Sequence, residues 1–118
     1  MKFESVRKLA MSLEAVTEEP HHNYSSFRVR GKIFVTVPPG QDFIHVFVAE
    51  DDREPALAMY PDFIEKLLWG SKVLGVRVKL ASAVPVVVKT LVHKAYEARV
   101  QKDAGPKTAR AKSMGLKS

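Results

Sequence analysis

The sequence predicts an α+β fold, a two-layer sandwich in which an antiparallel sheet packs against helices. Apolar residues recur at three- and four-residue spacing near both ends of the chain, which is typical of amphipathic helices. Residues 26–37 and 75–80 instead alternate between polar and apolar side chains, which is typical of strands with one buried face. Prolines and glycines separate these segments and mark the expected turns.

The first element is an amphipathic helix. Its apolar stripe consists of Phe3, Val6, Leu9, Ala10, Leu13 and Val16. We expect the helix to stop at Glu18-Glu19-Pro20, because the residue before a proline disfavours helical backbone. Residues 21–25 are then expected to form a loop that leads into the first strand.

Residues 26–37 are interpreted as a β-hairpin. A two-residue turn would mix apolar and basic side chains on each face. We therefore expect a three-residue turn that ends in Gly31 with a positive φ. This register pairs Phe27 with Ile33 or Val35 and leaves one face apolar. The other face would carry Ser26, Arg28, Lys32, Phe34 and Thr36.

A third strand follows at residues 43–48, after the turn at Pro38-Pro39-Gly40. It is apolar on both faces, so alternation alone does not select the inward face. If Ile44, Val46 and Val48 point into the core, then Phe43, His45 and Phe47 lie on the open face of the sheet.

The second half of the chain predicts a short helix over residues 50–60, with acidic residues at its start and Pro61 at its end. Residues 63–69 permit either a helix or a strand. Residues 75–80 are an alternating strand with Val76, Val78 and Leu80 inward and Arg77 and Lys79 outward. A final helix begins at Pro85. Its buried stripe consists of Val87, Val88, Leu91, Val92, Ala95 and Val100.

In these segments the chain resembles the MmcQ/YjbR family of small bacterial proteins. The resemblance rests on Pro20-His21, Ser26-Phe27-Arg28-Val29, Gly31-Lys32-Ile33-Phe34, Trp69-Gly70, Gly75 to Leu80 and Ala95-Tyr96. It implies a fold similar to secretion chaperones, in the order α-β-β-β-α-β-β-α, and so a strand up to Trp69. The chain has Val76 where the family usually has an aromatic residue, and Val84 where it usually has an acidic one. The family is often described as DNA-binding, with a double-wing surface.

Length and charge indicate one domain over residues 1–102 and a basic, disordered tail over residues 103–118. The formal net charge is +6, and the segment from Lys102 onward holds five cations and one anion. The absence of cysteine excludes disulfides and thiolate chemistry. No apolar run approaches the ~20 residues of a membrane span. We therefore expect a cytoplasmic protein that does not interact with membranes.

The open sheet face is the candidate site, because basic side chains there are interleaved with an aromatic ring. We take Arg28, Arg30, Lys32, Phe34, Arg77 and Lys79 as candidate nucleic-acid-binding residues. Such a surface can hold phosphates and stack bases. A solvated polar face and a protein interface are the alternatives, and the aromatic residues of 43–48 favour the interface.

Residues that would indicate catalysis or metal binding form no recognisable motif. His21 and His22 are adjacent, but the sequence shows no spacing typical of metal ligands. Ser25 has no nucleophile elbow around it, and Asp42 and Asp62 form no evident acid pair. We therefore predict a non-catalytic binding protein without metal or cofactor. Weak, sequence-independent DNA binding through the basic sheet face and tail is the leading function. A protein-interaction or homodimerising module on the same face is the alternative, and an enzyme is the third.

Overall fold

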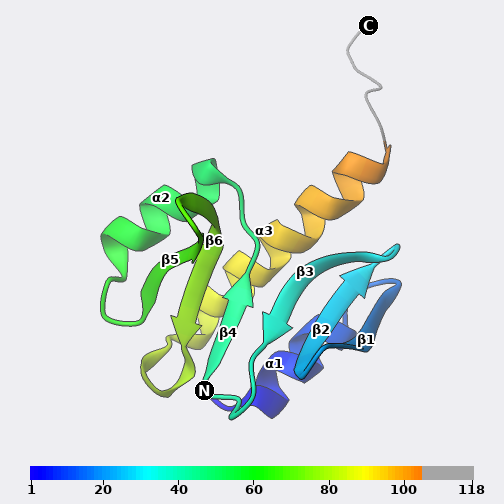
Figure 1. The fold of residues 1–118 in the computed structure, drawn as a ribbon, viewed down its shortest axis with the longest axis horizontal. Helices are drawn as coiled ribbons and strands as arrows, with labels where there is room; N and C mark the ends of the chain where they lie inside the picture. The colour runs from blue at the N-terminus through cyan, green and yellow to red at the C-terminus, as the bar shows by residue number, and fades with distance from the viewer. Residues whose placement is uncertain (105–118) are drawn as a thin grey trace, which may run out of the picture.

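The structure, a computed structural model, describes residues 1–104 and is shown in Figure 1. The elements are α1 (Phe3–Met11), β1 (Val16–His21), β2 (Tyr24–Val29), β3 (Lys32–Val37), β4 (Phe43–Val46), α2 (Glu50–Met59), β5 (Ile64–Trp69), β6 (Lys72–Lys79), a short 3-10 turn (Leu80–Ser82) and α3 (Pro85–Ala104). The sheet is antiparallel, with strand order β1-β2-β3-β4-β6-β5. The predicted α+β class, a sheet packed on helices, is confirmed.

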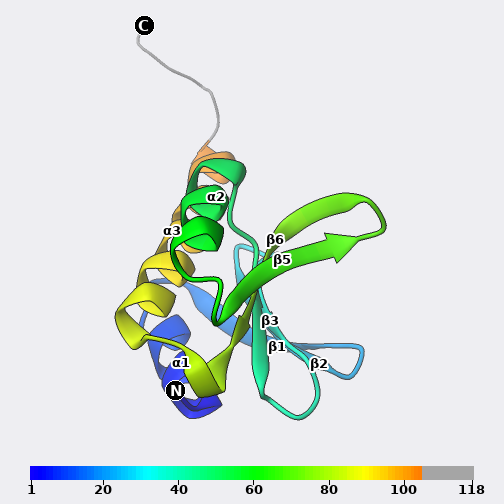
Figure 2. The same ribbon diagram turned by 90° about the vertical axis from the view of Figure 1, so that its left-hand side faces the viewer.

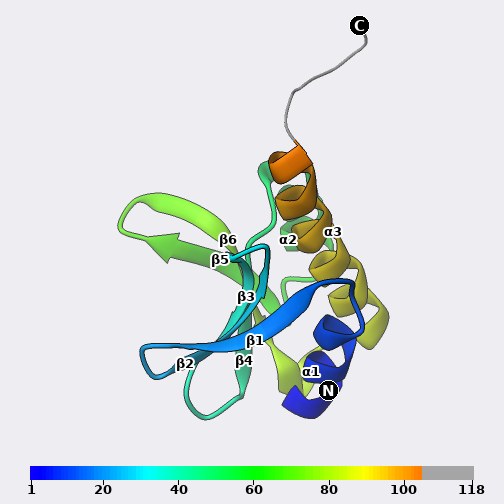
Figure 3. The same cartoon turned by 90° about the vertical axis from the view of Figure 1, so that its right-hand side faces the viewer.

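The helices all lie on one face of the sheet, as Figures 2 and 3 show from opposite sides. From the other face two hairpins, β1–β2 and β5–β6, extend away from the helices and diverge from each other. The sheet therefore has one covered face and one open face between two wings. Among the helices of residues 1–104, none combines the length and the apolar composition that crossing a bilayer requires.

The core lies between the sheet and the helices. The side chains taken as inward in residues 43–48 and 75–80 are all buried: Ile44, Val46, Val48, Val76, Val78 and Leu80. On α3, Val88, Leu91, Val92 and Ala95 are buried as predicted, while Val87 and Val100 are partly buried against the core. These positions were predictable because period two in a strand and period 3.6 in a helix each select one face.

The first helix is shorter than predicted. It ends at Met11, and Ala15 has a positive φ of 65°, so the chain turns before Val16. Val16 is buried, but as a residue of β1 paired with Val29. The predicted loop over residues 21–25 is also wrong in part, since β1 and β2 form a hairpin with a turn at His22-Asn23. Proline and glutamates suit β1 because it is an edge strand.

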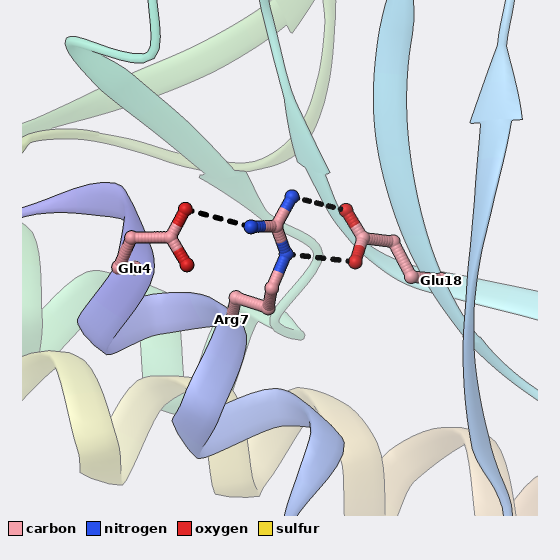
Figure 4. A network of polar contacts seen from close by, with 3 residues as sticks. All are labelled: Glu4, Arg7 and Glu18. Atoms are coloured by element: carbon pink, nitrogen blue, oxygen red, sulfur yellow. Dashed lines mark hydrogen bonds and ion pairs between the residues drawn. The ribbon is translucent and has the colours of Figure 1, made fainter.

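Arg7 joins α1 to this edge strand, as Figure 4 shows. Its Nε and Nη2 donate to the two carboxylate oxygens of Glu18 at 2.9 and 3.0 Å, and its Nη1 donates to Glu4 at 2.7 Å. Its guanidinium also lies 4.6 Å from the centre of the Phe3 ring. The hydrogen bonds to Glu18 and Glu4 raise the pKa of Arg7 above its usual value. A two-pronged contact of this kind fixes the orientation of a helix on a strand.

The β2–β3 hairpin has a two-residue turn, so the predicted three-residue turn is wrong. Arg30 and Gly31 both have positive φ, 53° and 78°, as a type I′ turn requires. The predicted pairing of Phe27 with Val35 is nevertheless confirmed. The register shifts between Phe27 and Arg28, which leaves Phe34 as an extra residue on β3. This bulge, and not a longer turn, determines which side chains of the hairpin face the core.

The remaining predictions concern the second half of the chain. Residues 64–69 form a strand, as the family resemblance implied, and α2 occupies the predicted region. Gly75 on β6 passes so close to β4 that a Cβ added there would meet the Val46 carbonyl oxygen. Helix α3 continues to Ala104, and the rest of the predicted tail lies outside the described residues.

Candidate functional site

The open face of the sheet holds a broad groove between the two wings, with a volume of about 1050 Å³. We call it the open-face groove. Its lining residues come from β1 to β6 and from α3: His21, His22, Tyr24, Arg28, Gly31, Lys32, Ile33, Thr36, His45, Phe47, Leu67, Leu68, Trp69, Leu74 and Arg99. No aspartate or glutamate of residues 1–104 is among them. The lining of the groove therefore combines cationic and apolar side chains.

His45 lies at the centre of the groove, on β4. Its Nδ1 is 3.3 Å from the hydroxyl of Thr36 on β3, and its ring lies 6.0 Å from that of Tyr24 on β2. Thr36 is buried, so this polar contact satisfies a hydroxyl that water scarcely reaches. Burial, and secondly the positive charge of Arg77, lowers the pKa of His45. The centre of the groove thus favours a neutral imidazole.

The cations of the groove gather around the β2–β3 hairpin. Arg28 is partly buried and donates to the Ser26 hydroxyl at 3.0 Å and to the Pro20 carbonyl at 3.4 Å. Lys32 follows the turn on β3 and is also partly buried. Arg99 reaches from α3 and donates from its Nε to the Ile33 carbonyl at 2.8 Å. Three positive side chains are therefore held at one side of the groove by different elements.

The opposite side of the groove is lined by apolar residues of the β5–β6 wing, which also carries the exposed charged residues Glu65, Lys66 and Lys72 outside the lining. Trp69 is 75% exposed, Leu68 is 56% exposed and Leu74 is 36% exposed. Gly70 has a positive φ of 63° and allows the tight turn that places Trp69 at the end of this wing. Large apolar side chains clustered on an exposed hairpin are unusual for a solvated surface and typical of a contact site.

The predicted site residues are only partly brought together. Arg28 and Lys32 line the groove, and Arg30 is exposed at the neighbouring turn. Arg77 does not line it. Its guanidinium bonds to Glu65 at 3.1 Å and lies 3.7 Å from the centre of the Phe43 ring. Lys79 is exposed at the far end of β6, opposite Phe43 in the register.

The predicted placement of Phe34 on the open face is wrong. Phe34 is fully buried, and its ring contacts that of Tyr96 on α3 with centroids 5.7 Å apart. The bulge in β3 is the physical reason, because the extra residue lets Phe34 and Val35 both be buried although they are consecutive. Phe34 therefore belongs to the core and is unavailable to a ligand.

Arg99 and Trp69 were not among the predicted site residues. Arg99 follows Ala95 by four positions, so the helical period places it on the same side of α3 as the buried stripe. The position of this cation next to the buried stripe is visible in the sequence and could have identified Arg99 as a candidate residue. Trp69 contributed to the family resemblance, but its exposure depends on how far the β5–β6 hairpin extends from the core, which local sequence does not specify.

The histidines at the other wing form a pair. The rings of His21 and His22 lie 4.9 Å apart at the end of the β1–β2 hairpin. Within residues 1–104, no three histidine, aspartate, glutamate or cysteine side chains come together in a way that could hold a metal ion. The two rings instead add polar, ionisable surface to the rim of the groove.

Comparison with known proteins places this architecture in a family. Residues 11–98, most of the chain, match the sequence profile of the YjbR family. Comparison with curated proteins gives no match. The matched range covers the whole sheet, both wings of the groove and α3 up to the residue before Arg99. The chain belongs to the YjbR family.

Proposed function

We propose that the open-face groove binds nucleic acid without sequence preference, and that the protein acts by binding and not by catalysis. The observation that carries the proposal is the lining of the groove, which includes three cations and no aspartate or glutamate of residues 1–104. Such a surface attracts the phosphate groups that recur along a nucleic-acid chain.

The composition of the contacts favours sequence-independent binding. Arg28 and Arg99 each use part of their guanidinium for a backbone carbonyl, which orients the remaining donors. Arginine and lysine contacts to phosphate position a protein on nucleic acid but carry no sequence information. The sequence places four further cations beyond residue 104, at Lys107, Arg110, Lys112 and Lys117, and these add to the attraction for phosphate.

The test is the salt dependence of DNA binding by a triple variant, Arg28→Gln, Lys32→Gln and Arg99→Gln, in the full-length protein. A short labelled DNA is measured as a single strand and as a duplex by fluorescence anisotropy. Each lost phosphate contact should flatten the slope of log K against log salt by about 0.7 for a single strand or about 0.9 for a duplex. Circular dichroism and the melting temperature check that the variant is folded.

A matched control removes the same charge elsewhere. Lys8, Lys89 and Lys94 are exposed on α1 and α3, and none of them lines the groove. Changing all three to glutamine should lower the affinity only slightly and leave the slope nearly unchanged. Because the C-terminal cations are present in both triple variants, they contribute equally to DNA binding by the two proteins. Equal effects of the two triple variants would show that net charge, and not the groove, determines binding.

A second candidate function is homodimerisation or protein binding through the β5–β6 wing. The exposure of Leu68, Trp69 and Leu74 on one hairpin is the observation that favours it. Sedimentation of the full-length protein over a range of concentrations tests it. A dimer that Leu68→Asp converts to a monomer, while Met59→Asp on α2 does not, would support this function in place of nucleic-acid binding.

A further inference from the structure

The open-face groove is lined by cations near the β2–β3 hairpin and by apolar side chains on the β5–β6 wing. Arg28, Lys32 and Arg99 belong to the side around the β2–β3 hairpin. Leu67, Leu68, Trp69 and Leu74 form the side on the β5–β6 wing. The aromatic ring of Tyr24 and that of Phe47 lie in the same groove. A ligand that fills the groove therefore meets charge along one edge and apolar or aromatic surface along the other.

A single strand of nucleic acid has this asymmetry and a duplex does not. In a single strand the phosphates follow one edge, and the unstacked bases are free to contact aromatic side chains on the other. A duplex carries phosphates on both strands and keeps the faces of its bases inside the stack. Placed in this groove, it would bring charged phosphates against Leu68 and Trp69 and would gain nothing from their exposure.

The number of cations leads to the same conclusion. A protein that makes roughly 6–10 phosphate contacts with duplex DNA needs a similar number of cationic groups. Among residues 1–104, the lining of the groove supplies Arg28, Lys32 and Arg99 and the three histidines His21, His22 and His45. The pKa of His45 is lowered by burial and by Arg77, so this histidine adds little positive charge. A few phosphates of one strand match this supply better than the two strands of a duplex.

We infer that the groove selects single-stranded nucleic acid, with phosphates along Arg28, Lys32 and Arg99 and a base stacked on Trp69. This inference rests on the proposed function and specifies its ligand. Stacking on an aromatic ring tolerates every base, because each base has a π face, so the selection for single strands carries no preference for sequence. DNA and RNA single strands share this chemistry.

Trp69 gives a direct readout, because it is the single tryptophan of the chain. The full-length protein is titrated with a thymidine strand of roughly 12 nucleotides, with a uridine strand of the same length, and with a DNA duplex of that length. Anisotropy of a label on the nucleic acid measures binding, and tryptophan emission measures contact with Trp69. We expect one or both single strands to bind at least about tenfold more tightly than the duplex and to quench the emission on saturation.

Variants separate stacking from charge. Trp69→Ala should weaken single-strand binding about tenfold, while Trp69→Phe should retain most of the affinity, since it keeps a ring. Met59→Ala is the matched control, because Met59 is an apolar residue of α2, 68% exposed, outside the groove. Trp69→Ala removes an exposed side chain, so its fold should be unaffected, and its melting temperature checks this.

The outcomes distinguish this inference from the function on which it rests. If the strands and the duplex bind equally, or if saturating binding leaves Trp69 emission unchanged, the inference is overturned, and the proposed function is then decided by the two triple variants alone. If no nucleic acid binds even at low salt, the proposed function fails and the inference with it. If Trp69→Ala and Met59→Ala reduce binding equally, stacking on Trp69 is excluded.

Discussion

The ring of Phe34 on β3 packs edge-on against the ring of Tyr96 on α3, with centroids 5.7 Å apart and an interplanar angle of 72°. The hydroxyl of Tyr96 also donates to the Glu14 carbonyl at 2.8 Å, in the turn between α1 and β1. The pair thus connects the central sheet, the last helix and the first turn. It places Phe34 in the structural core that supports the groove.

Truncation of Phe34 should therefore affect stability and not ligand contact. We expect Phe34→Ala to lower the free energy of unfolding by about 3–5 kcal/mol, the usual cost of removing a buried aromatic ring. Urea denaturation followed by circular dichroism measures it. Phe47→Ala is the comparison, since Phe47 is only partly buried and lies in the groove. A loss at Phe34 no larger than that at Phe47 would contradict this placement.

The contrast between Phe34 and strand β6 shows what the sequence could predict. Val76 and Val78 alternate with charged residues in one unbroken register, so the pattern indicated which side chains are buried. In β3 the bulge interrupts the alternation. A bulge depends on pairing with the neighbouring strand. The local sequence around Phe34 does not distinguish a bulge in β3 from a longer turn before it.

The candidate site was predicted only in part, because some of it depends on strand pairing. The hairpin pattern alone places Arg28 and Lys32 on the open face, and both line the groove. Strand β1 was missed because Glu18-Glu19-Pro20 favours a helix stop, whereas edge pairing with β2 makes it a strand. The position of Arg77 against Glu65 depends on how β5 and β6 pair, since these two residues lie opposite each other in the register. The periodicity of the sequence does not predict such long-range pairings.

Gly75 should be intolerant of any side chain. A Cβ at this position would overlap the Val46 carbonyl oxygen and lie 2.9 Å from the Phe47 Cα, both backbone atoms that cannot move without displacing β4. We expect Gly75→Ala to destabilise the protein by about 1–3 kcal/mol, as overpacked sites do. Chemical denaturation measures the loss. An unchanged unfolding midpoint would mean that the two strands lie farther apart.

Gly31 should be sensitive for a different reason. No atom lies within 4 Å of a Cβ built there, but its φ is +78°. Gly31→Ala should cost about 1 kcal/mol from backbone strain alone. Gly31→Asn is the matched control and should cost less, because asparagine adopts the left-handed conformation more readily. Equal losses for alanine and asparagine would argue against strain as the cause.

His45 should make stability depend on pH. Its pKa is lowered in the folded protein by burial and by Arg77, so the unfolded chain binds the proton more readily. Stability is therefore fully present above the unfolded value near 6.5 and falls as the pH drops from there to the folded value. Below the folded value His45 contributes no further loss. We expect the melting temperature of His45→Asn to fall less than that of the wild type between about pH 7 and pH 5.

The comparison is with the wild type, measured in the same buffers over the same pH range. A His45→Asn profile parallel to that of the wild type, with the same loss on acidification, would show that other groups cause the dependence.

The pairing of Arg77 predicts that it contributes little to nucleic-acid binding. Its guanidinium is occupied by Glu65 and by the ring of Phe43, whereas Arg99 lines the groove. Arg77→Gln should therefore leave the salt dependence of binding nearly unchanged, while Arg99→Gln should flatten the log–log slope by about 0.7–0.9. Each variant removes one positive charge, so the two are matched. Equal changes in slope would place the phosphate contacts across the whole sheet face, including β6, and would contradict their restriction to the β2–β3 side of the groove.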